Sequence, residues 1–289
     1  MAFLQENLVP RIPLGQYAEN VIDYITDTFE GFFDVVQDGL DGFVSAFEAL
    51  LNFPPELVMI AILAAIAFYF AGWRVAVFAI LGSLLILGLD LWEDTMLTLA
   101  LVLSSTVVAL AIGIPLGILA VQSRSIEAVV KPALDIMQTM PAFVYLVPMI
   151  ILLGLGSGPA LVATVIFAMP PAVRLTMLGI QQVPRNTVEA AHAFGATRGQ
   201  TLLKVELPQA LSTIMAGVNQ VIMLALSMVV IAALVGAGGL GEVVVRGLGQ
   251  LNVGTAFEGG VGIVIVAIYL DRVTRRLGQK RKKGGKGGK

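Results

Sequence analysis

The sequence predicts an all-α polytopic membrane protein, with its amino end outside the cell and its carboxyl end inside, from three observations. Hydrophobic residues make up 57% of the chain and charged residues 13%, whereas about one-quarter of a soluble domain is charged. Apolar runs long enough to span a bilayer recur between short polar loops. Residues 1–56 hold half of the acidic residues, and residues 271–289 hold half of the basic ones. Because basic segments stay in the cytoplasm, this charge division predicts an odd number of spans.

Residues 17–51 are predicted to form an amphipathic helix at the outer surface or against the bundle. Acidic residues recur every few positions, which excludes a membrane span, while Val21, Ile25 and Phe29 belong to an apolar set with helical spacing. A break is expected near Gly39 or Gly42. The acidic polar face favours contact with protein over contact with anionic lipid. We therefore assign residues 1–53 to an extracytoplasmic N-terminal amphipathic segment.

The rest of the chain is expected to cross the membrane about seven times. A single helix over 57–90 would be about 50 Å long, too long for a bilayer core of about 30 Å, so it should turn at Gly72–Arg74. Gly113 and Gly117 have a spacing that allows close helix contact. The Gly-rich segment 236–256 is expected to lie outside. The expected spans are 57–72, 75–91, 95–121, 133–154, 160–180, 209–235 and 257–273.

These spans make up a transmembrane domain over 54–275, which is followed by a basic tail over 276–289. The tail is expected to be disordered in the cytoplasm. The whole protein is expected in a prokaryotic cytoplasmic membrane as a multi-pass protein, in contact with lipid and without a nucleic-acid partner.

The residue types that support catalysis or metal binding are scarce. His192 is the only histidine and there is no cysteine, so no metal site is expected. Residues 236–241 match G-x-G-x-x-G but follow a membrane span instead of a strand, which excludes a nucleotide-binding fingerprint. The sequence has no G-x-x-x-x-G-K-[ST] motif. Any ATP and Mg²⁺ would therefore be bound by another subunit, and this chain is expected to bind no cofactor and to catalyse no reaction.

Polar residues in the interiors of the predicted spans, away from their ends, are uncharged. Ion-coupled carriers usually hold Asp, Glu, His or Lys at the middle of the bilayer, and no such residue occurs there in this sequence. Side chains of Ser, Thr, Asn and Gln can line a path for a neutral or zwitterionic solute, and they can equally form hydrogen bonds between helices. These residues are Ser104, Ser105, Thr106, Gln138, Thr139, Thr164, Thr176, Asn219, Gln220 and Ser227.

The loop over 183–208 is polar but is predicted to be helical. Pro184 ends the preceding span, and Val188, Ala191, Phe194 and Leu202 can form one apolar face. Gly195 permits a bend or the close approach of another backbone, and Pro208 is expected to start a new helix. The pattern predicts a short amphipathic helix pair on the cytoplasmic face, which could dock into a groove on a partner.

Within this loop, the spacing Glu189-Ala190-Ala191, three residues, Gly195, nine residues, Val205-x-Leu207-Pro208 resembles the signature loop of ABC importer permease subunits. Val205 stands where isoleucine is usual. The stretches 137–159, 167–184, 208–242 and 259–274 are similar to the glycine betaine/proline betaine type of these permeases. The resemblance extends over about 54–275.

The resemblance implies a type I ABC importer permease fold. It implies that two permease copies surround a path, that two ATPase subunits dock on 185–203, and that an extracytoplasmic binding protein delivers a quaternary-ammonium solute for osmoprotection. ATP binding and hydrolysis by the partner would drive alternating access. The implied ATPase-coupling residues are Glu189, Ala190, Ala191, Phe194, Gly195, Leu207 and Pro208. The path residues expected on the fourth and sixth spans are Met137, Tyr145, Asn219, Met223 and Ser227.

Two alternatives remain open from the sequence. The chain could be an ABC permease for choline, carnitine or methionine, because the loop contacts the motor and not the solute. It could also be a secondary carrier or channel that works without ATP. The loop signature and the lack of charge within the spans count against this second alternative.

Overall fold

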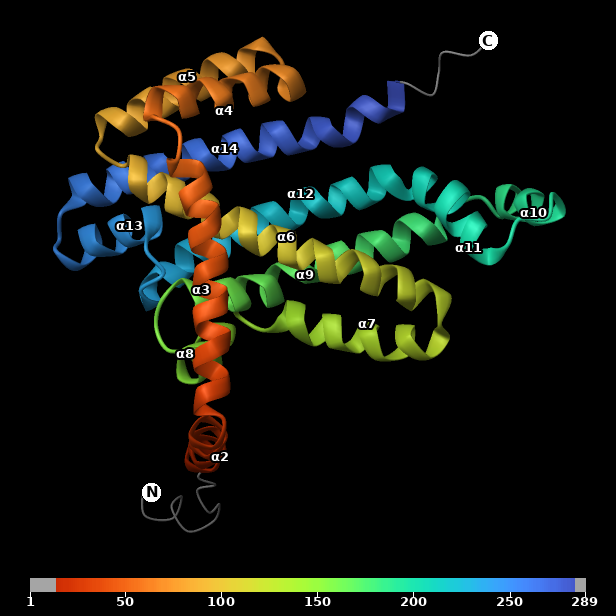
Figure 1. Cartoon of the computed structure of the whole chain (residues 1–289), viewed down its shortest axis with the longest axis horizontal. Helices are drawn as coiled ribbons and strands as arrows, with labels where there is room; N and C mark the ends of the chain where they lie inside the picture. The colour runs from red at the N-terminus through yellow and green to blue at the C-terminus, as the bar shows by residue number, and fades with distance from the viewer. Residues whose placement is uncertain (1–13, 284–289) are drawn as a thin grey trace, which may run out of the picture.

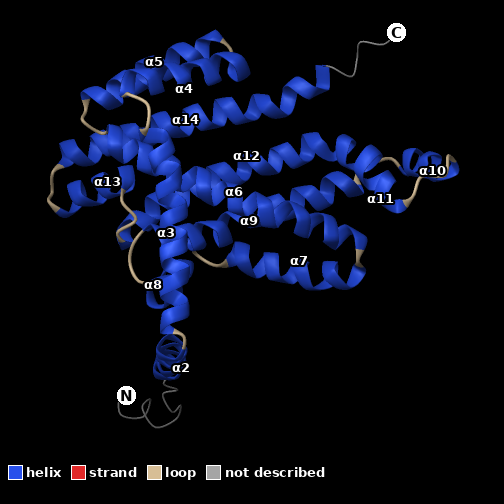
Figure 2. Cartoon of the chain, viewed as in Figure 1, coloured by secondary structure: helices blue, strands red, loops and turns tan. Residues whose placement is uncertain are grey.

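A computed structural model describes residues 14–283, and every regular element in that range is a helix (Figure 2). Residues 1–13 of the predicted N-terminal segment and residues 284–289 of the predicted tail lie outside this range. The amino-terminal and hairpin helices are α2 (Leu14–Thr28), α3 (Glu30–Asn52), α4 (Glu56–Ala71) and α5 (Trp73–Gly88). The central helices are α6 (Trp92–Gln122), α7 (Arg124–Thr139), α8 (Ala142–Leu153) and α9 (Ser157–Gln181). The remaining helices are α10 (Arg185–Ala193), α11 (Arg198–Thr201), α12 (Leu207–Ala232), α13 (Gly239–Gly249) and α14 (Val253–Lys283).

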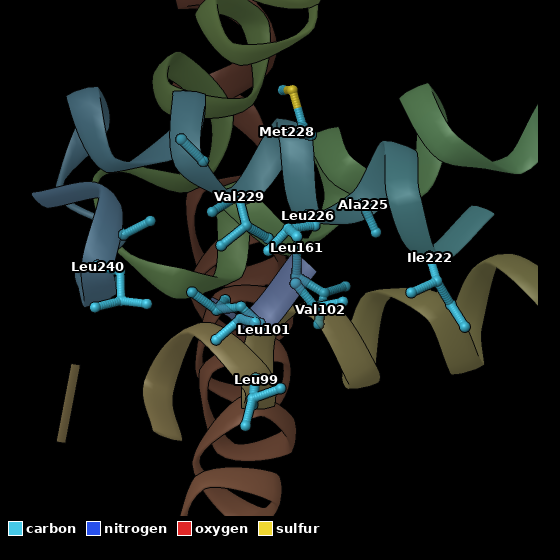
Figure 3. Packing of buried hydrophobic residues seen from close by; sticks show 14 of the residues in the cluster. Leu99, Leu101, Val102, Leu161, Ile222, Ala225, Leu226, Met228, Val229 and Leu240 are labelled. Carbon is cyan, nitrogen blue, oxygen red and sulfur yellow. The ribbon is translucent and has the colours of Figure 1, made fainter. Parts of the chain in front are cut away.

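The helices α6, α9, α12 and α14 run side by side, and α3 crosses one end of this bundle (Figure 1). The helix α9 is at the centre, where it packs against both α6 and α12. Side chains of α6, α12 and α13 meet Leu161 of α9 in one apolar cluster (Figure 3). Such a cluster fixes how the helices of the bundle pack.

Glycines allow these helices to approach closely. A Cβ atom at Gly117 of α6 would lie 2.8 Å from the carbonyl oxygen of Val173 in α9, and one at Gly113 would lie 2.8 Å from Cβ of Ala172. On the other side of α9, a Cβ atom at Gly217 of α12 would lie 3.2 Å from the carbonyl oxygen of Pro171. The close helix contact predicted at Gly113 and Gly117 is therefore confirmed, and it joins α6 to α9.

The turn predicted within 57–90 is present. It is made by Gly72, whose φ of +91° favours glycine, and it joins α4 to α5. Each of these helices has 16 residues, or about 24 Å at 1.5 Å per residue. Four helical segments of the described chain are long and apolar enough to cross a membrane, and six are if each of two bent helix pairs counts as one span. The number seven therefore stays a prediction.

The expected fourth span, 133–154, is bent into two helices. The helix α7 ends at Thr139, Pro141 has extended backbone angles, and α8 leaves at 98° to α7. The cause is Pro141, which lacks an N–H group and forces Met140 out of the helical region. The hydroxyl of Tyr145 donates a hydrogen bond to the carbonyl oxygen of Met137 and so ties the two helices together across the bend.

One other expectation is corrected. The helix α3 runs unbroken through Gly39 and Gly42, and the break in the amino-terminal helix falls at Phe29. The segment 236–256, which was expected to lie outside, contains the helix α13. Leu240 and Val243 of α13 are buried against the bundle, and the hydroxyl of Thr98 in α6 accepts a hydrogen bond of 2.9 Å from the N–H of Leu240. Burial and this contact stabilise a helix in a Gly-rich segment.

The loops that were predicted to lie in the cytoplasm gather at one end of the bundle. The turns after α4 and α6, the helices α10 and α11, and the carboxyl end of α14 all lie there, while α3 and α13 lie at the other end (Figure 1). This division agrees with the alternation of basic and acidic segments along the chain. The predicted tail, 276–289, begins inside a helix, because α14 extends to Lys283.

Candidate functional site: the loop between α9 and α12

The loop between α9 and α12 is built from two short helices that meet at a fixed turn. The helix α10 ends with a double hydrogen bond, in which the N–H of Ala196 donates to the carbonyl of Ala191 and the N–H of Gly195 donates to that of His192. Gly195 has a φ of +82°. This is the Schellman arrangement, in which a left-handed residue satisfies the last carbonyls of a helix. The expected helix pair and the bend at Gly195 are confirmed.

The second helix of the loop, α11, begins with a capping box. The hydroxyl of Thr197 accepts a hydrogen bond from the N–H of Gln200, and the side-chain oxygen of Gln200 accepts one from the N–H of Thr197. These reciprocal bonds satisfy N–H groups that have no partner within the helix. The sequence analysis missed this feature, although Thr-x-x-Gln is a sequence signal for it. The segment from Gly195 to Gln200 is therefore a rigid corner.

The signature residues divide into an exposed group and a packed group. Glu189, Ala190, Phe194 and Gly195 are exposed, and the side chain of Phe194 is 93% exposed at the end of α10. A Cβ atom at Gly195 would meet no atom within 4 Å, so glycine is needed there for its backbone angle and not for packing within this chain. An exposed phenylalanine beside a rigid turn is a surface suited to insertion into a partner.

The packed group anchors the loop to the bundle. Ala191 and Leu207 are half-buried. Leu202 and Leu207 pack against an apolar cluster that contains Ile180 of α9 and Ile214 of α12, together with residues of α6. A force applied to the loop is therefore applied to the ends of three bundle helices.

Pro208 lies in the first turn of α12, as expected, but α12 is not separate from the loop. Residues 198–235 form one continuous helical run, which contains a π-helical turn at Leu202–Glu206 followed by Pro208. In this turn the N–H of Leu207 donates to the carbonyl of Leu202, five residues earlier. A π turn re-pairs the backbone next to a residue that lacks an N–H group, so the helix can continue through proline. The loop and α12 thus form one helical unit.

Among the five expected path residues, Tyr145 contacts Met137 and Ser227 contacts Met223, each through a hydrogen bond. Met137 is half-buried and packs in a cluster with Leu134 and Met177. Tyr145 is 7% exposed, and its ring centroid lies 6.3 Å from that of Phe167.

Asn219 faces α14. Its side-chain oxygen accepts a hydrogen bond of 2.6 Å from the hydroxyl of Thr274. Ser227 is exposed and Met223 is half-buried, one turn apart on α12, and the hydroxyl of Ser227 donates to the carbonyl of Met223 at 3.0 Å.

Ser227 belongs to an exposed stripe along α12, only part of which was expected from the sequence. Exposed residues recur at helical spacing along one side of α12. Several carry hydroxyl or amide groups, which are unfavourable against lipid tails. The stripe comprises Gln209, Ser212, Ala216, Gln220 and Ser227, with Met223 beside it.

Comparison with known proteins adds to this geometry. Residues 109–283 match the family described as the inner membrane component of binding-protein-dependent transport systems. The glycine betaine transport system permease protein OpuAB of Bacillus subtilis is 50% identical, over 96% of this chain and 98% of its own length. The glycine betaine/proline betaine transport system permease protein ProW of Escherichia coli is 46% identical, over 95% of this chain and 77% of its own length.

A similar fold occurs in a solved structure. A chain of the MetNI methionine ABC transporter, in an inward-facing conformation, superposes with a TM-score of 0.59 at 24% identity, over 66% of this chain and 95% of that chain. This likeness confirms the fold expected from the sequence, that of a type I ABC importer permease, and at this level of identity it carries no argument about the solute.

Proposed function

Because the chain belongs to the family of inner membrane components of binding-protein-dependent transport systems, we propose that it is the multi-pass permease subunit of an ATP-driven importer for glycine betaine and proline betaine. Its relative in Bacillus subtilis is named for glycine betaine, its relative in Escherichia coli is named for both solutes, and each matches nearly the whole chain. The alternative of a secondary carrier is not favoured, since such carriers act without a motor subunit. The solute is a zwitterion, which suits a pathway lined by uncharged polar groups.

The observation that supports a motor-driven mechanism is the construction of the loop between α9 and α12. Its exposed part presents Phe194 beside the fixed turn at Gly195. Its packed part holds Leu202 and Leu207 against the bundle. A loop that served only as a connection would need neither a rigid corner nor an exposed aromatic side chain. We propose that an ATPase subunit binds Glu189, Ala190 and Phe194, and that Leu207 and Pro208 connect that surface to α12.

The route by which the loop moves the bundle follows from its two ends. The helix α9 precedes the loop and α12 continues from it without interruption. These two helices pack along each other, with close approaches at Gly179 and Gly217. A displacement of the loop therefore moves the α9–α12 pair as a unit, because packed interiors transmit motion instead of absorbing it.

We propose that the exposed stripe of α12 faces the solute path and a second permease copy across it. This proposal keeps Met223 and Ser227 from the residues expected from the sequence. It gives Met137, Tyr145 and Asn219 packing roles, in agreement with their contacts. Of the five path residues expected from the sequence, the proposed path thus keeps two.

The test is uptake of labelled glycine betaine into vesicles that contain the permease, its ATPase and its binding protein. We expect uptake to require ATP on the side of the membrane where the ATPase is bound, and to persist when ion gradients are collapsed. Unlabelled proline betaine should compete, and methionine should not. Uptake that survives ATP depletion while an ion gradient is kept would overturn the importer proposal. Competition by methionine alone would overturn the assignment of betaines as the solute.

A further inference from the structure

A second site lies away from the α9–α12 loop, where the α4–α5 turn meets the carboxyl half of α14. A cavity of about 780 Å³ opens there between Gly72–Val75 and Phe78 on the hairpin and Ile268, Arg272 and Arg275 on α14. Ala67, Ala76 and Val273 are buried together at the junction of α4, α5 and α14. The cavity is therefore built on a packed three-helix junction, and its shape does not depend on a single side chain.

Three guanidinium groups border this cavity, and two of them have no carboxylate partner. Arg275 pairs with Asp271 on its own helix at 2.8 Å. Within the described residues, neither Arg74 nor Arg272 forms an ion pair. Arginine presents a planar set of donors that matches a phosphate group. Two uncompensated arginines at one cavity produce a positive potential that an anion would neutralise.

The walls of the cavity are partly apolar and lie at the end of the hydrophobic helices. Trp73 is 64% exposed at the turn, and the guanidinium of Arg74 lies 5.8 Å from the centroid of its ring. Phe78 and Ile268 line the same cavity. Tryptophan and arginine at the end of an apolar hairpin are typical of the boundary between lipid tails and headgroups. A ligand there would have an anionic group beside an apolar body.

The first N–H groups of α5 add a further attraction for an anion. The carbonyl of Gly72 accepts hydrogen bonds from the N–H groups of Val75 and Ala76, so the first-turn N–H groups that lack a partner within the helix are those of Trp73 and Arg74. The dipole of the helix also favours negative charge at this end. These groups add to the attraction for an anion that the two arginines provide.

We propose that this cavity binds the phosphate headgroup of an anionic phospholipid, with Arg74 and Arg272 as the headgroup ligands and Trp73, Phe78 and Ile268 beside the upper acyl chains. The exposed apolar side chains of Phe68, Val77 and Leu81 on the hairpin give those chains a surface to lie along. The lipid joins the hairpin to α14, which also packs on α12. This binding does not depend on which solute the protein transports.

The test uses the fluorescence of Trp73 in the full-length chain in nanodiscs. The chain has two tryptophans, so Trp92→Phe leaves Trp73 as the sole reporter. Brominated phosphatidylglycerol and brominated phosphatidylcholine, each added at increasing fractions, report which lipid occupies the cavity. We expect phosphatidylglycerol to quench at a lower fraction of total lipid, with the preference falling about fivefold for each arginine removed in Arg74→Gln and Arg272→Gln.

The matched control is the double variant Arg124→Gln/Lys131→Gln, which removes two basic residues from the same end of the protein but outside the cavity. It should retain the preference, whereas Arg74→Gln/Arg272→Gln should lose it while keeping the same elution volume. Equal quenching by both lipids, or equal loss in the control variant, would overturn the proposal. Inorganic phosphate at millimolar concentration should leave lipid quenching unchanged, and displacement of the lipid by phosphate would identify a site for the free anion instead.

Discussion

The carboxylate of Asp41 on α3 accepts a hydrogen bond of 2.6 Å from the N–H of Gly158, in the first turn of α9. The same carboxylate oxygen accepts a second bond from the hydroxyl of Ser157. The helix α9 has no side-chain cap of its own at Gly156, so an acidic residue more than a hundred positions earlier supplies it. This contact fixes α3 across the end of the central helix. The negative carboxylate also interacts favourably with the positive end of the α9 dipole.

Replacing Asp41 should therefore destabilise the bundle. We expect Asp41→Ala to lower the free energy of unfolding by about 1–2 kcal/mol, because a charged cap is lost at the end of a buried helix. Thermal unfolding in detergent, followed by loss of the monodisperse chromatographic peak, measures this. Asp38→Ala removes the same charge from an exposed position on the same helix and should leave the midpoint unchanged, so an equal loss in both variants would show that net charge and not capping matters.

Gly117 tests the close packing of α6 on α9. A Cβ atom there would lie 2.8 Å from the backbone oxygen of Val173, so Gly117→Ala must push the two helices apart, at a cost of about 1–3 kcal/mol. The matched variant is Gly88→Ala, since a Cβ atom at Gly88 would have no neighbour within 4 Å. The yield of folded protein and its unfolding midpoint should fall only for Gly117→Ala. A midpoint equal to that of the parent would contradict the packing described.

The role of the turn at Gly195 can be tested apart from that of its neighbours, because substitutions differ in how well they tolerate its backbone angle φ. Gly195→Val places a β-branched residue at a φ of +82°, which costs about 1–2 kcal/mol and should reduce uptake per ATP hydrolysed on the order of tenfold. Gly195→Asn should retain most of the coupling, because asparagine tolerates this region.

Gly199→Ala, on the next helix of the same loop and with open space around it, should couple normally. The measurement is the ratio of solute uptake to ATPase activity in reconstituted vesicles. Normal coupling in Gly195→Val would mean that the left-handed turn is not needed for transmission.

Phe194 is predicted to act on the partner and not on folding. Its side chain is 93% exposed, so Phe194→Ala should leave the unfolding midpoint unchanged. If the ring is an anchor for the ATPase, its truncation should weaken the association by about 2 kcal/mol or more, or roughly thirtyfold. Affinity for the purified ATPase, measured in detergent, checks this. Phe53→Ala removes a ring that is 88% exposed at the opposite end of the bundle and should have no effect on that affinity.

The sequence predicted the positions of most helices, because apolar runs and charged loops are local signals. It failed where proline or distant contacts decide the structure. Pro141 divides an apolar run that looked like one span, and the rule for residues before proline would have indicated that break. The helix α13 depends on Thr98 and on burial of Leu240, neither of which is visible from local composition.

The exposed surface and the turn of the loop could be predicted from the sequence, but its anchoring to the bundle could not. Its signature spacing indicated the exposed surface, and Gly195 indicated the turn. The anchoring of Leu202 and Leu207 against three helices arises from residues as distant as Ile114. The path residues stay a prediction, and exposure along α12 depends on which of its faces the other helices cover. Only the spacing of Gln209, Ser212, Gln220 and Ser227 could have suggested that stripe.

The most direct test of the central claim, that a separate ATPase drives this protein through the α9–α12 loop, is cross-linking from position 193. The chain has no cysteine, so Ala193→Cys provides a single thiol at the exposed end of α10 and leaves the Phe194 ring in place, and Phe53→Cys provides a control at the other end. A thiol-to-amine cross-linker of short span should join the chain to its ATPase from position 193 and not from position 53, with a yield that changes when ATP is bound. An adduct that fails to form from position 193, or that forms equally from both positions, would contradict the account.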